Sequence, residues 1–203
     1  MLDFARPLVI VDADEVLLQF IVALEKFLER NGCLLDLKSF AIHGNVRRQA
    51  TNEVLPNAEV TQLLESFFAA ETREMQAVPG AAPALRRLSR HAQIVVLSNL
   101  PGSALDARRA NLAALDMPYA VIAGSGPKGV VVKRLIESFP HPVVFVDDLP
   151  PHLTSVARET PHVNRLHFVA DPRLAKLLAP AVDAHRRIDT WPQAAAWIES
   201  VIA

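Results

Sequence analysis

The sequence has little of three things: cysteine, charge of one sign and long apolar runs. Its single cysteine, Cys33, cannot form an intramolecular disulfide and has no clustered ligand partners for zinc. Twenty-one Lys and Arg residues stand against twenty-two Asp and Glu residues, so no strong field attracts nucleic acid or anionic lipid. No apolar run approaches the length that crosses a bilayer. We therefore expect a cytoplasmic protein that binds neither nucleic acid nor a membrane.

The chain is long enough for one core, or for one core plus a small inserted module, because 51% of its 203 residues are hydrophobic. Short, nearly continuous apolar runs recur between helical stretches, as is typical of parallel strands covered on both faces. The segments that join the last four runs are about helix length and indicate right-handed crossovers. The sequence therefore predicts an α/β fold, a Rossmann-like doubly wound parallel sheet, with strands at 8–11, 94–97, 120–123, 143–146 and 166–169.

More than eighty residues separate the first predicted strand from the second, too many for one crossover helix. Residues 16–31 and 59–77 have apolar positions at helical spacing, and Asn31-Gly32 is a typical helix end. Val78-Pro79-Gly80 marks the return to the main domain, because proline and glycine resist continuing a helix. We predict two domains: a helical cap inserted after the first strand, at 17–77, and a Rossmann-like core formed by 1–16 and 78–203.

Polar side chains directly follow three of the apolar runs, and a lysine opens the helix expected between the third and fourth runs. In an open α/β sheet, the ligand crevice lies beyond the carboxyl ends of the strands. The start of a helix adds backbone N–H groups and a dipole that favour an anion. We therefore expect these side chains to meet at one edge of the sheet; they are Asp12, Asp14, Ser98, Asn99, Lys128, Asp147 and Asp148.

Four carboxylates in one crevice would repel one another, because each close negative charge disfavours ionisation of the next. Cations must therefore lie among them. Lys128 supplies one positive charge, and Mg²⁺, which prefers oxygen ligands, would supply two more. Such a site can hold a phosphoryl group through the metal and the lysine while a carboxylate attacks it in line. The pattern indicates phosphoryl transfer, which needs little beyond positioning and charge stabilisation.

Four short motifs, VIVDADEV, VVLSN, GPKG and FVDD, occur in the order and context found in the haloacid dehalogenase (HAD) superfamily, and the chain resembles that superfamily over nearly its whole length. The resemblance implies a Mg²⁺-dependent phosphatase that cleaves a small phosphorylated substrate through an aspartyl phosphate. It also implies that the insertion is a C1-type cap over the site. The stretch from Val78 to Leu88 is similar to the family's usual return to the core after such a cap.

The resemblance also implies a role for each site residue. Asp12 would be the nucleophile and Asp14 the general acid and base, while Ser98, Asn99 and Lys128 would bind the transferring phosphoryl group. The metal would be held by Asp12, the backbone carbonyl of Asp14, Asp148 and Asp147, with Asp147 acting directly or through water. One position departs from the family pattern: Glu15 stands where glycine is common, in the turn that leads to the cap.

Each motif alone has an ordinary structural explanation. An Asp before a helix is commonly an N-cap, polar residues after a strand commonly form turns, and lysines are usually solvated. Four such explanations would all have to fall at the same sheet edge, and this coincidence favours the functional interpretation. Lys133 competes with Lys128, but it lies inside a helix and is expected on its exposed face.

Three other features favour structural interpretations. Arg47 and Arg48 are expected on the solvated face of a helix, and His43 without a partner is expected to be a surface or capping residue. Trp191 and Trp197 are expected to pack the last helix onto the sheet.

Phosphatase and phosphomutase remain open as activities, because in a mutase the phosphoryl group returns to a bound intermediate on the same scaffold. A dehalogenase, whose Asp attacks carbon without a metal, is disfavoured by Asp14 and by the Asp147-Asp148 pair. A non-enzymatic phosphate-binding module is disfavoured by intact Asp12 and Asp14, although Glu15 is compatible with it. A receiver domain is disfavoured by the order of the motifs. Side chains of the cap would set the substrate.

Overall fold

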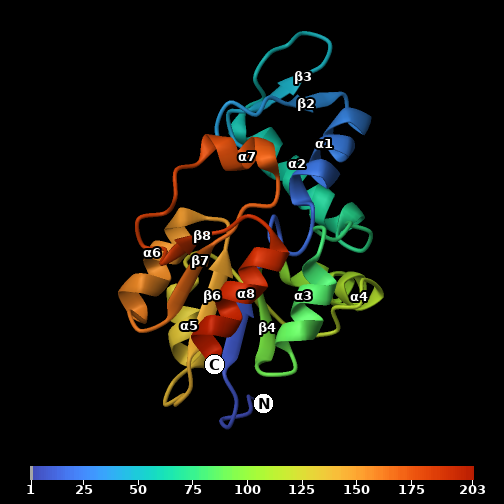
Figure 1. Ribbon diagram of the computed structural model, residues 1–203. Helices are drawn as coiled ribbons and strands as arrows, with labels where there is room; N and C mark the ends of the chain where they lie inside the picture. The colour runs from blue at the N-terminus through green and yellow to red at the C-terminus, as the bar shows by residue number, and fades with distance from the viewer. Residues whose placement is uncertain (1) are drawn as a thin grey trace.

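A six-stranded parallel sheet forms the centre of the computed structural model, which describes residues 2–203 (Figure 1). The strand order is β5-β4-β1-β6-β7-β8, so the first strand lies inside the sheet and the chain crosses over on both sides of it. This arrangement confirms the predicted Rossmann-like fold. The strands are β1 (Leu8–Val11), β4 (Gln93–Asn99), β5 (Ala120–Gly124), β6 (Val143–Asp147), β7 (Asn164–His167) and β8 (Arg186–Arg187).

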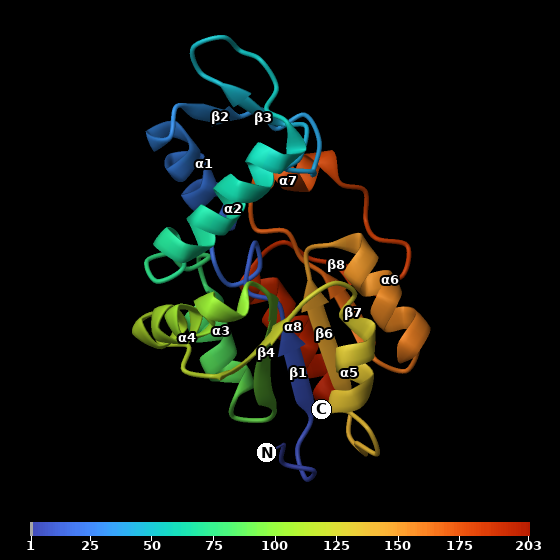
Figure 2. The same cartoon turned by 180° about the vertical axis from the view of Figure 1, so that it is seen from behind.

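Helices cover both faces of the sheet (Figures 1 and 2). In β1, Val9 and Val11 belong to one apolar cluster whereas Leu8 and Ile10 belong to the other, which explains why the strand is apolar at every position. The first cluster includes residues of α3 (Ala81–Leu88) and α8 (Trp191–Ile202), and the second includes residues of α5 (Gly129–Leu135) and α6 (Pro150–Glu159). A 3-10 turn, η1 (Gly102–Ala104), leads into α4 (Leu105–Ala114), which packs beside β5.

The inserted segment lies beyond the carboxyl ends of the strands (Figure 1). Its two helices are α1 (Phe20–Arg30) and α2 (Asn57–Glu71). They match the two predicted helical stretches, although α1 is shorter at both ends and α2 begins two residues earlier and ends six residues earlier than predicted. Between them an antiparallel pair of short strands, β2 (Cys33–Leu35) and β3 (Val46–Arg48), was not predicted. Each strand has only three residues, too few for a strand periodicity to show in the sequence. The insertion is therefore two helices and a small β-hairpin.

Two adjacent segments connect the insertion to the sheet. The Gln19 backbone N–H donates to the Gln76 carbonyl at 2.9 Å, and the Val78 N–H donates to the Leu17 carbonyl at 2.8 Å. A third contact comes from α7 (Pro172–Leu177), in which the Arg173 guanidinium donates to both carboxylate oxygens of Glu25 in α1 at 2.8 Å. The insertion is thus joined to the core by the paired connecting segments and held from the side by α7.

The last predicted strand, 166–169, is two residues too far along the chain, because β7 ends at His167. Phe168 and Val169 are apolar for another reason. The Phe168 ring packs against Trp191 with ring centroids 5.1 Å apart, and the Val169 N–H donates to Asp189 rather than to a strand. The expected packing of the last helix is confirmed, since Trp191 is fully buried and Trp197 packs against the same cluster. No helix within 2–203 combines the length and the apolar character that a membrane span requires.

Candidate active site

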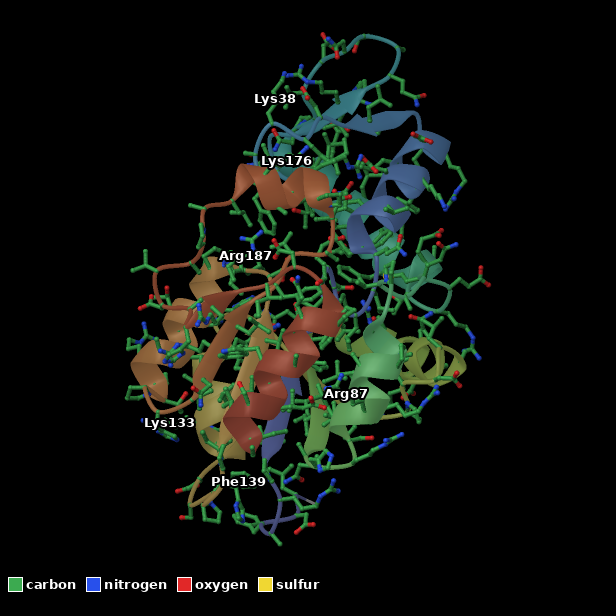
Figure 3. All side chains as sticks on the ribbon, viewed as in Figure 1. Lys38, Arg87, Lys133, Phe139, Lys176 and Arg187 are labelled. Carbon is green, nitrogen blue, oxygen red and sulfur yellow. The ribbon has the colours of Figure 1, made fainter. Side chains whose placement is uncertain are left out.

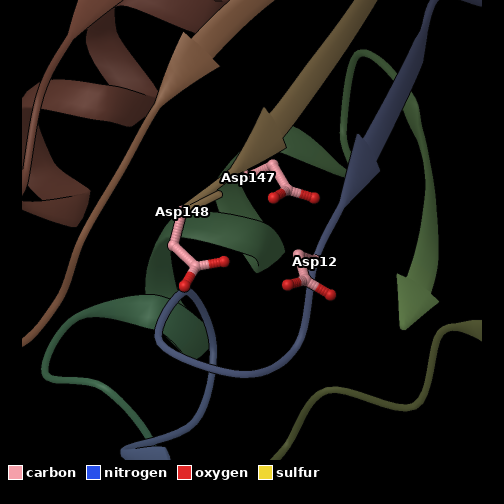
Figure 4. Close-up of side chains that lie close together, drawn as sticks. All are labelled: Asp12, Asp147 and Asp148. Carbon is pink, nitrogen blue, oxygen red and sulfur yellow. The ribbon is translucent and has the colours of Figure 1, made fainter. Parts of the chain in front are cut away.

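Three carboxylates meet where β1 and β6 end (Figure 4). Asp12 directly follows β1, Asp147 is the last residue of β6 and Asp148 follows it. The Asp12 N–H donates to the Val146 carbonyl at 2.9 Å, so the sheet ladder continues to the residue that carries the first carboxylate. One oxygen of each carboxylate lies within 4.8 Å of the other two, and all three side chains are buried.

Lys128 lies among these carboxylates and is also buried. Its Nζ is 2.7 Å from Asp12 Oδ1 and 2.6 Å from Asp147 Oδ2. Burial lowers the pKa of Lys128, but the two carboxylates outweigh it and raise the pKa above its ordinary value, so the lysine is charged. The next residue, Gly129, begins α5, and a Cβ at this position would overlap the Ser155 backbone carbonyl. Glycine therefore allows α5 to approach α6 and places Lys128 under the site.

The Asp147-Asp148 pair suits a cation. Burial raises the pKa of Asp147 to about 7 against the opposing charge of Lys128. Burial, followed by the charges of Asp147 and Asp12, raises the pKa of Asp148 well above its usual range. Among the residues that the structure describes, none donates a hydrogen bond to the Asp148 carboxylate. A divalent cation between these groups would reverse both shifts, because it favours the ionised form of every carboxylate around it.

Asp14 has a partner that the sequence did not reveal. The Arg108 guanidinium lies 2.8 Å from Asp14 Oδ1 and donates to Oδ2 at 3.1 Å. Arg108 is fully buried and also contacts Met75 at the end of the insertion. Burial raises the pKa of Asp14 above its ordinary value, and the charge of Arg108 opposes that rise. Asp14 is therefore paired with a buried arginine that favours its ionised form.

Ser98 and Asn99 end β4 beside this cluster. Ser98 is fully buried, and its hydroxyl oxygen has no hydrogen-bond partner among residues 2–203. Asn99 donates to the Gly126 carbonyl at 2.9 Å and lies 3.3 Å from His152 Nε2, while its own carbonyl oxygen and His152 Nδ1 are buried without partners in that same range. Such atoms suit an additional polar group at the site, because buried polar atoms in proteins are nearly always paired.

Glu15 has a structural role at the position where glycine was expected. Its φ of 58° lies in the left-handed region that favours glycine. The carboxylate is buried and accepts hydrogen bonds from the Ile21 N–H at 2.7 Å and the Asp171 N–H at 3.0 Å. The Ala170 N–H donates to the Glu15 carbonyl at 2.9 Å. Glu15 thereby joins the first turn of the insertion to the segment before α7, and burial raises its pKa to about 7.

The structure separates the remaining candidates from this cluster. Lys133 lies on the outer face of α5, with a side chain 63% exposed (Figure 3). Arg47 and Arg48 lie on β3 rather than on a helix, so the helical assignment was wrong, and they pair with Asp36 and Glu59.

Two residues of the site were not predicted from the sequence. His152 lines the cavity, but it follows Pro150-Pro151, a pair that favours a loop, whereas α6 begins at Pro150. The ion pair of Arg108 with Asp14 was not predicted, because an arginine in a polar helix is normally expected to be exposed to solvent.

A cavity of about 390 Å³ lies between the sheet edge and the insertion. Its floor includes Asp12, Asp14, Lys128 and Asp148. The opposite wall comes from the first turn of α1, from α2 and from the loop 40–43, which includes the exposed His43. Three of the four predicted catalytic and metal residues, Asp12, Asp14 and Asp148, therefore line one cavity, whereas Asp147 lies behind it beside Lys128.

The chain matches no family model and no curated protein. Its fold is similar to solved structures over almost the whole length. A HAD family hydrolase from Deinococcus radiodurans with bound phosphate and sodium has a TM-score of 0.65 and 18% identity, with 98% of this chain and 97% of that chain covered.

A putative β-phosphoglucomutase from Thermotoga maritima has a TM-score of 0.59 and 15% identity, over 96% and 99% of the two chains. The L-2-haloacid dehalogenase from Xanthobacter autotrophicus has a TM-score of 0.60 and 13% identity, over 95% and 98%. The similarity thus spans proteins named for three different activities. What they share with this chain is the arrangement of sheet, helices and insertion, and the fold of the protein is that of the haloacid dehalogenase superfamily.

Proposed function

We propose that the protein is a Mg²⁺-dependent phosphohydrolase that acts on a small phosphorylated substrate through an aspartyl phosphate on Asp12. The observation that carries the proposal is the buried group of three carboxylates around Lys128, which opens into the cavity. These three carboxylates stand against the single positive charge of Lys128. The excess of two negative charges matches one divalent ion and disfavours binding of a phosphate without it.

The side chains fit such an ion by their chemistry. Asp12, Asp147 and Asp148 offer only oxygen atoms, as Mg²⁺ prefers, and we assign the ion to them together with the backbone carbonyl of Asp14. When bound, the ion would neutralise phosphoryl oxygens. Lys128 and the unpaired Ser98 hydroxyl would hold other oxygens of the same group, with Asn99 beside them.

The chain's own residues would carry both chemical steps. An Asp12 carboxylate oxygen attacks phosphorus as the bond from phosphorus to the leaving oxygen breaks, and Asp14 gives its proton to that oxygen. Asp14 then takes a proton from water, whose oxygen attacks phosphorus, and the Asp12 oxygen departs. The insertion, taken as a cap domain at 17–77 on a core of 1–16 and 78–203, would keep bulk water out meanwhile. A reaction at carbon would give the Asp147-Asp148 pair no task, which disfavours a dehalogenase.

The test is to identify the phosphorylated residue. We expect Mg²⁺-dependent release of phosphate from acetyl phosphate, and borohydride reduction during turnover followed by mass spectrometry should place the label on Asp12. Asp12→Asn should lose activity by roughly four orders of magnitude or more yet remain folded, because the amide oxygen can still accept from Lys128. Label on Asp147 or Asp148 would contradict the assignment of the nucleophile. Phosphate that stays on an organic product instead of entering water would indicate a phosphomutase.

A further inference from the structure

The wall of the cavity that faces the site is almost entirely apolar. The insertion contributes eight lining residues, of which only His43 is polar. The remaining wall on that side includes Leu174 from α7 and Leu149 from the start of α6. The apolar lining residues that matter most below are Phe20, Ile21, Phe40, Ile42, Leu64 and Phe68.

This apolar wall is a packed part of the insertion. The Phe20 and Phe68 rings lie 6.0 Å apart, and each packs edge-on against Phe67, at 5.3 Å and 5.5 Å. Phe67 is fully buried, so the two rings that line the cavity have a fixed support behind them. A ligand group that reaches this wall therefore meets aromatic and aliphatic carbon at a defined position.

No lysine or arginine of the insertion lines the cavity. Arg47 pairs with Asp36 and Arg48 with Glu59, and neither lines the cavity. Arg173 of α7 is taken by Glu25 and Asp171. Within the described residues, the lining offers only Lys128, already between two carboxylates, and two histidines. His43 shares a hydrogen bond with Thr61, and burial and the charge of Lys128 lower the pKa of His152 to about 4, so its ring is neutral. A second phosphate or a carboxylate on the substrate would find no free counter-charge there.

Hydroxyl groups of a substrate would also lack partners at the apolar wall. The two oxygens of Glu15, the acid on this side of the cavity, already accept backbone N–H groups. The lining atoms that are buried without partners belong to Asn99 in β4 and His152 in α6, on the core side of the cavity. Each hydroxyl buried without a partner against the apolar wall would cost roughly 5- to 150-fold in affinity. The volume of about 390 Å³, which must also hold the phosphoryl group, is near the lower end of the usual range for small-molecule sites. A sugar phosphate or a nucleotide therefore suits the cavity poorly.

We infer that the substrate is the phosphate monoester of a small, uncharged, apolar alcohol, aromatic or branched aliphatic, that carries no second anionic group. This inference depends on the proposed phosphohydrolase function. The phosphoryl group lies on the charged floor, and the alcohol carbon chain lies against Phe20, Leu64 and Phe68.

The test compares kcat/KM for benzyl phosphate and 3-methylbutyl phosphate with kcat/KM for glucose 6-phosphate, AMP and phosphoserine, using acetyl phosphate as a class-neutral probe. We expect the two apolar esters to be preferred by at least about 100-fold. If acetyl phosphate is hydrolysed but a polar ester equals or exceeds benzyl phosphate, the substrate inference is wrong and the phosphohydrolase proposal stands. If no phosphate compound is hydrolysed with Mg²⁺ present, the proposed function fails and the inference fails with it.

A matched pair of variants tests the wall itself. Leu64 and Leu63 are adjacent in α2 and both half-buried, but Leu64 lines the cavity whereas Leu63 lines a groove on the other side of the helix. Leu64→Asn should lower kcat/KM for benzyl phosphate about tenfold, mainly through KM, and reduce its preference over glucose 6-phosphate. Leu63→Asn should change neither. Thermal melting of both variants separates loss of folding from loss of binding. Equal effects of the two substitutions on KM would contradict the assignment of the wall.

Discussion

Across the cavity, the floor at the ends of β1 and β6 carries charge, whereas the roof formed by α1, α2 and the loop 40–43 is apolar. The floor residues sit on strands inside a parallel sheet, and Lys128 fixes two of the carboxylates by ion pairs. The roof is held by apolar packing around Phe67. Under the proposed function, the charged floor performs the reaction, and the roof, which is the apolar wall described above, selects the alcohol. The predictions below test this division of roles and the contacts that join the two surfaces.

Removal of divalent metal should have the largest effect, since the floor depends on it and the roof does not. Chelation should abolish turnover; Mg²⁺ should restore it and Ca²⁺ should not, because the larger, looser coordination shell of calcium misplaces the nucleophile. Mg²⁺ at 100 times its Kd should also stabilise the folded protein by about 2.7 kcal/mol, measured by urea denaturation.

Variants of two aspartates provide the control for this metal effect. Asp148→Asn should lose most of the Mg²⁺-dependent stabilisation, whereas Asp116→Asn, on an aspartate whose side chain is 78% exposed, should keep it. Full turnover in chelator after extensive dialysis would contradict the metal site.

Asp14→Asn should show an effect that depends on the leaving group. For benzyl phosphate, whose leaving oxygen needs a proton, phosphorylation of Asp12 should slow by about 10²- to 10⁴-fold. For 4-nitrophenyl phosphate the leaving group is stable without a proton, so rapid mixing should show a burst of nitrophenolate followed by slow turnover and accumulated phosphoenzyme.

Asp106→Asn is the control for this experiment, because Asp106 pairs only with Arg109 on the surface and its side chain is 94% exposed. Equal slowing of the first step for both esters would mean that Asp14 acts only through its ion pair with Arg108.

The sequence predicted the floor better than the roof, and the reason is physical. Asp12, Lys128 and the Asp147-Asp148 pair each follow or precede a regular element directly, so the position of the element places the side chain. Arg108 meets Asp14 across 94 positions of the chain, a distance over which periodicity says nothing. The sequence of α2 likewise has apolar residues at helical spacing. That pattern does not predict that Leu64 faces the cavity and that Leu63 does not.

The Arg108–Asp14 pair should contribute strongly to stability, because Arg108 is fully buried beside Met75 of the insertion. Removal of one partner of a buried pair typically costs about 3–5 kcal/mol. We expect Arg108→Met to lie near the lower end, since the Asp14 side chain is 18% exposed and solvent can partly solvate it. Urea denaturation measures the loss.

Two comparisons isolate the pair. Arg109→Met changes the adjacent arginine, whose ion pair with Asp106 is on the surface, and should cost less than about 1 kcal/mol. Combining Asp14→Asn with Arg108→Met should recover part of the stability lost in the arginine variant, because no unpaired buried charge then remains. Additive losses would show that Arg108 stabilises the protein by packing rather than through Asp14.

The smallest effect concerns His152, at the border between the charged floor and the apolar roof. Burial and the charge of Lys128 lower its pKa from 6.5 to about 4, so the folded protein keeps this ring neutral at pH values where the unfolded chain binds a proton. The unfolded state therefore takes up more protons below pH 6.5, and the folded state loses stability as the pH falls from 6.5 towards 4. Between pH 7.5 and pH 5 this amounts to about 2 kcal/mol. His152→Gln cannot take up that proton, so its free energy of unfolding should fall by about 2 kcal/mol less than that of the parent over the same interval.

The comparison with the parent isolates His152. The buried carboxylates also make the free energy of unfolding depend on pH, but their contribution is common to both proteins and cancels in the comparison. His162→Gln, at an exposed histidine just after α6, should leave the pH dependence of the parent unchanged. Parallel curves for His152→Gln and the parent would mean that His152 takes up its proton in the folded protein as readily as in the unfolded chain, and that the border of the cavity is open to water.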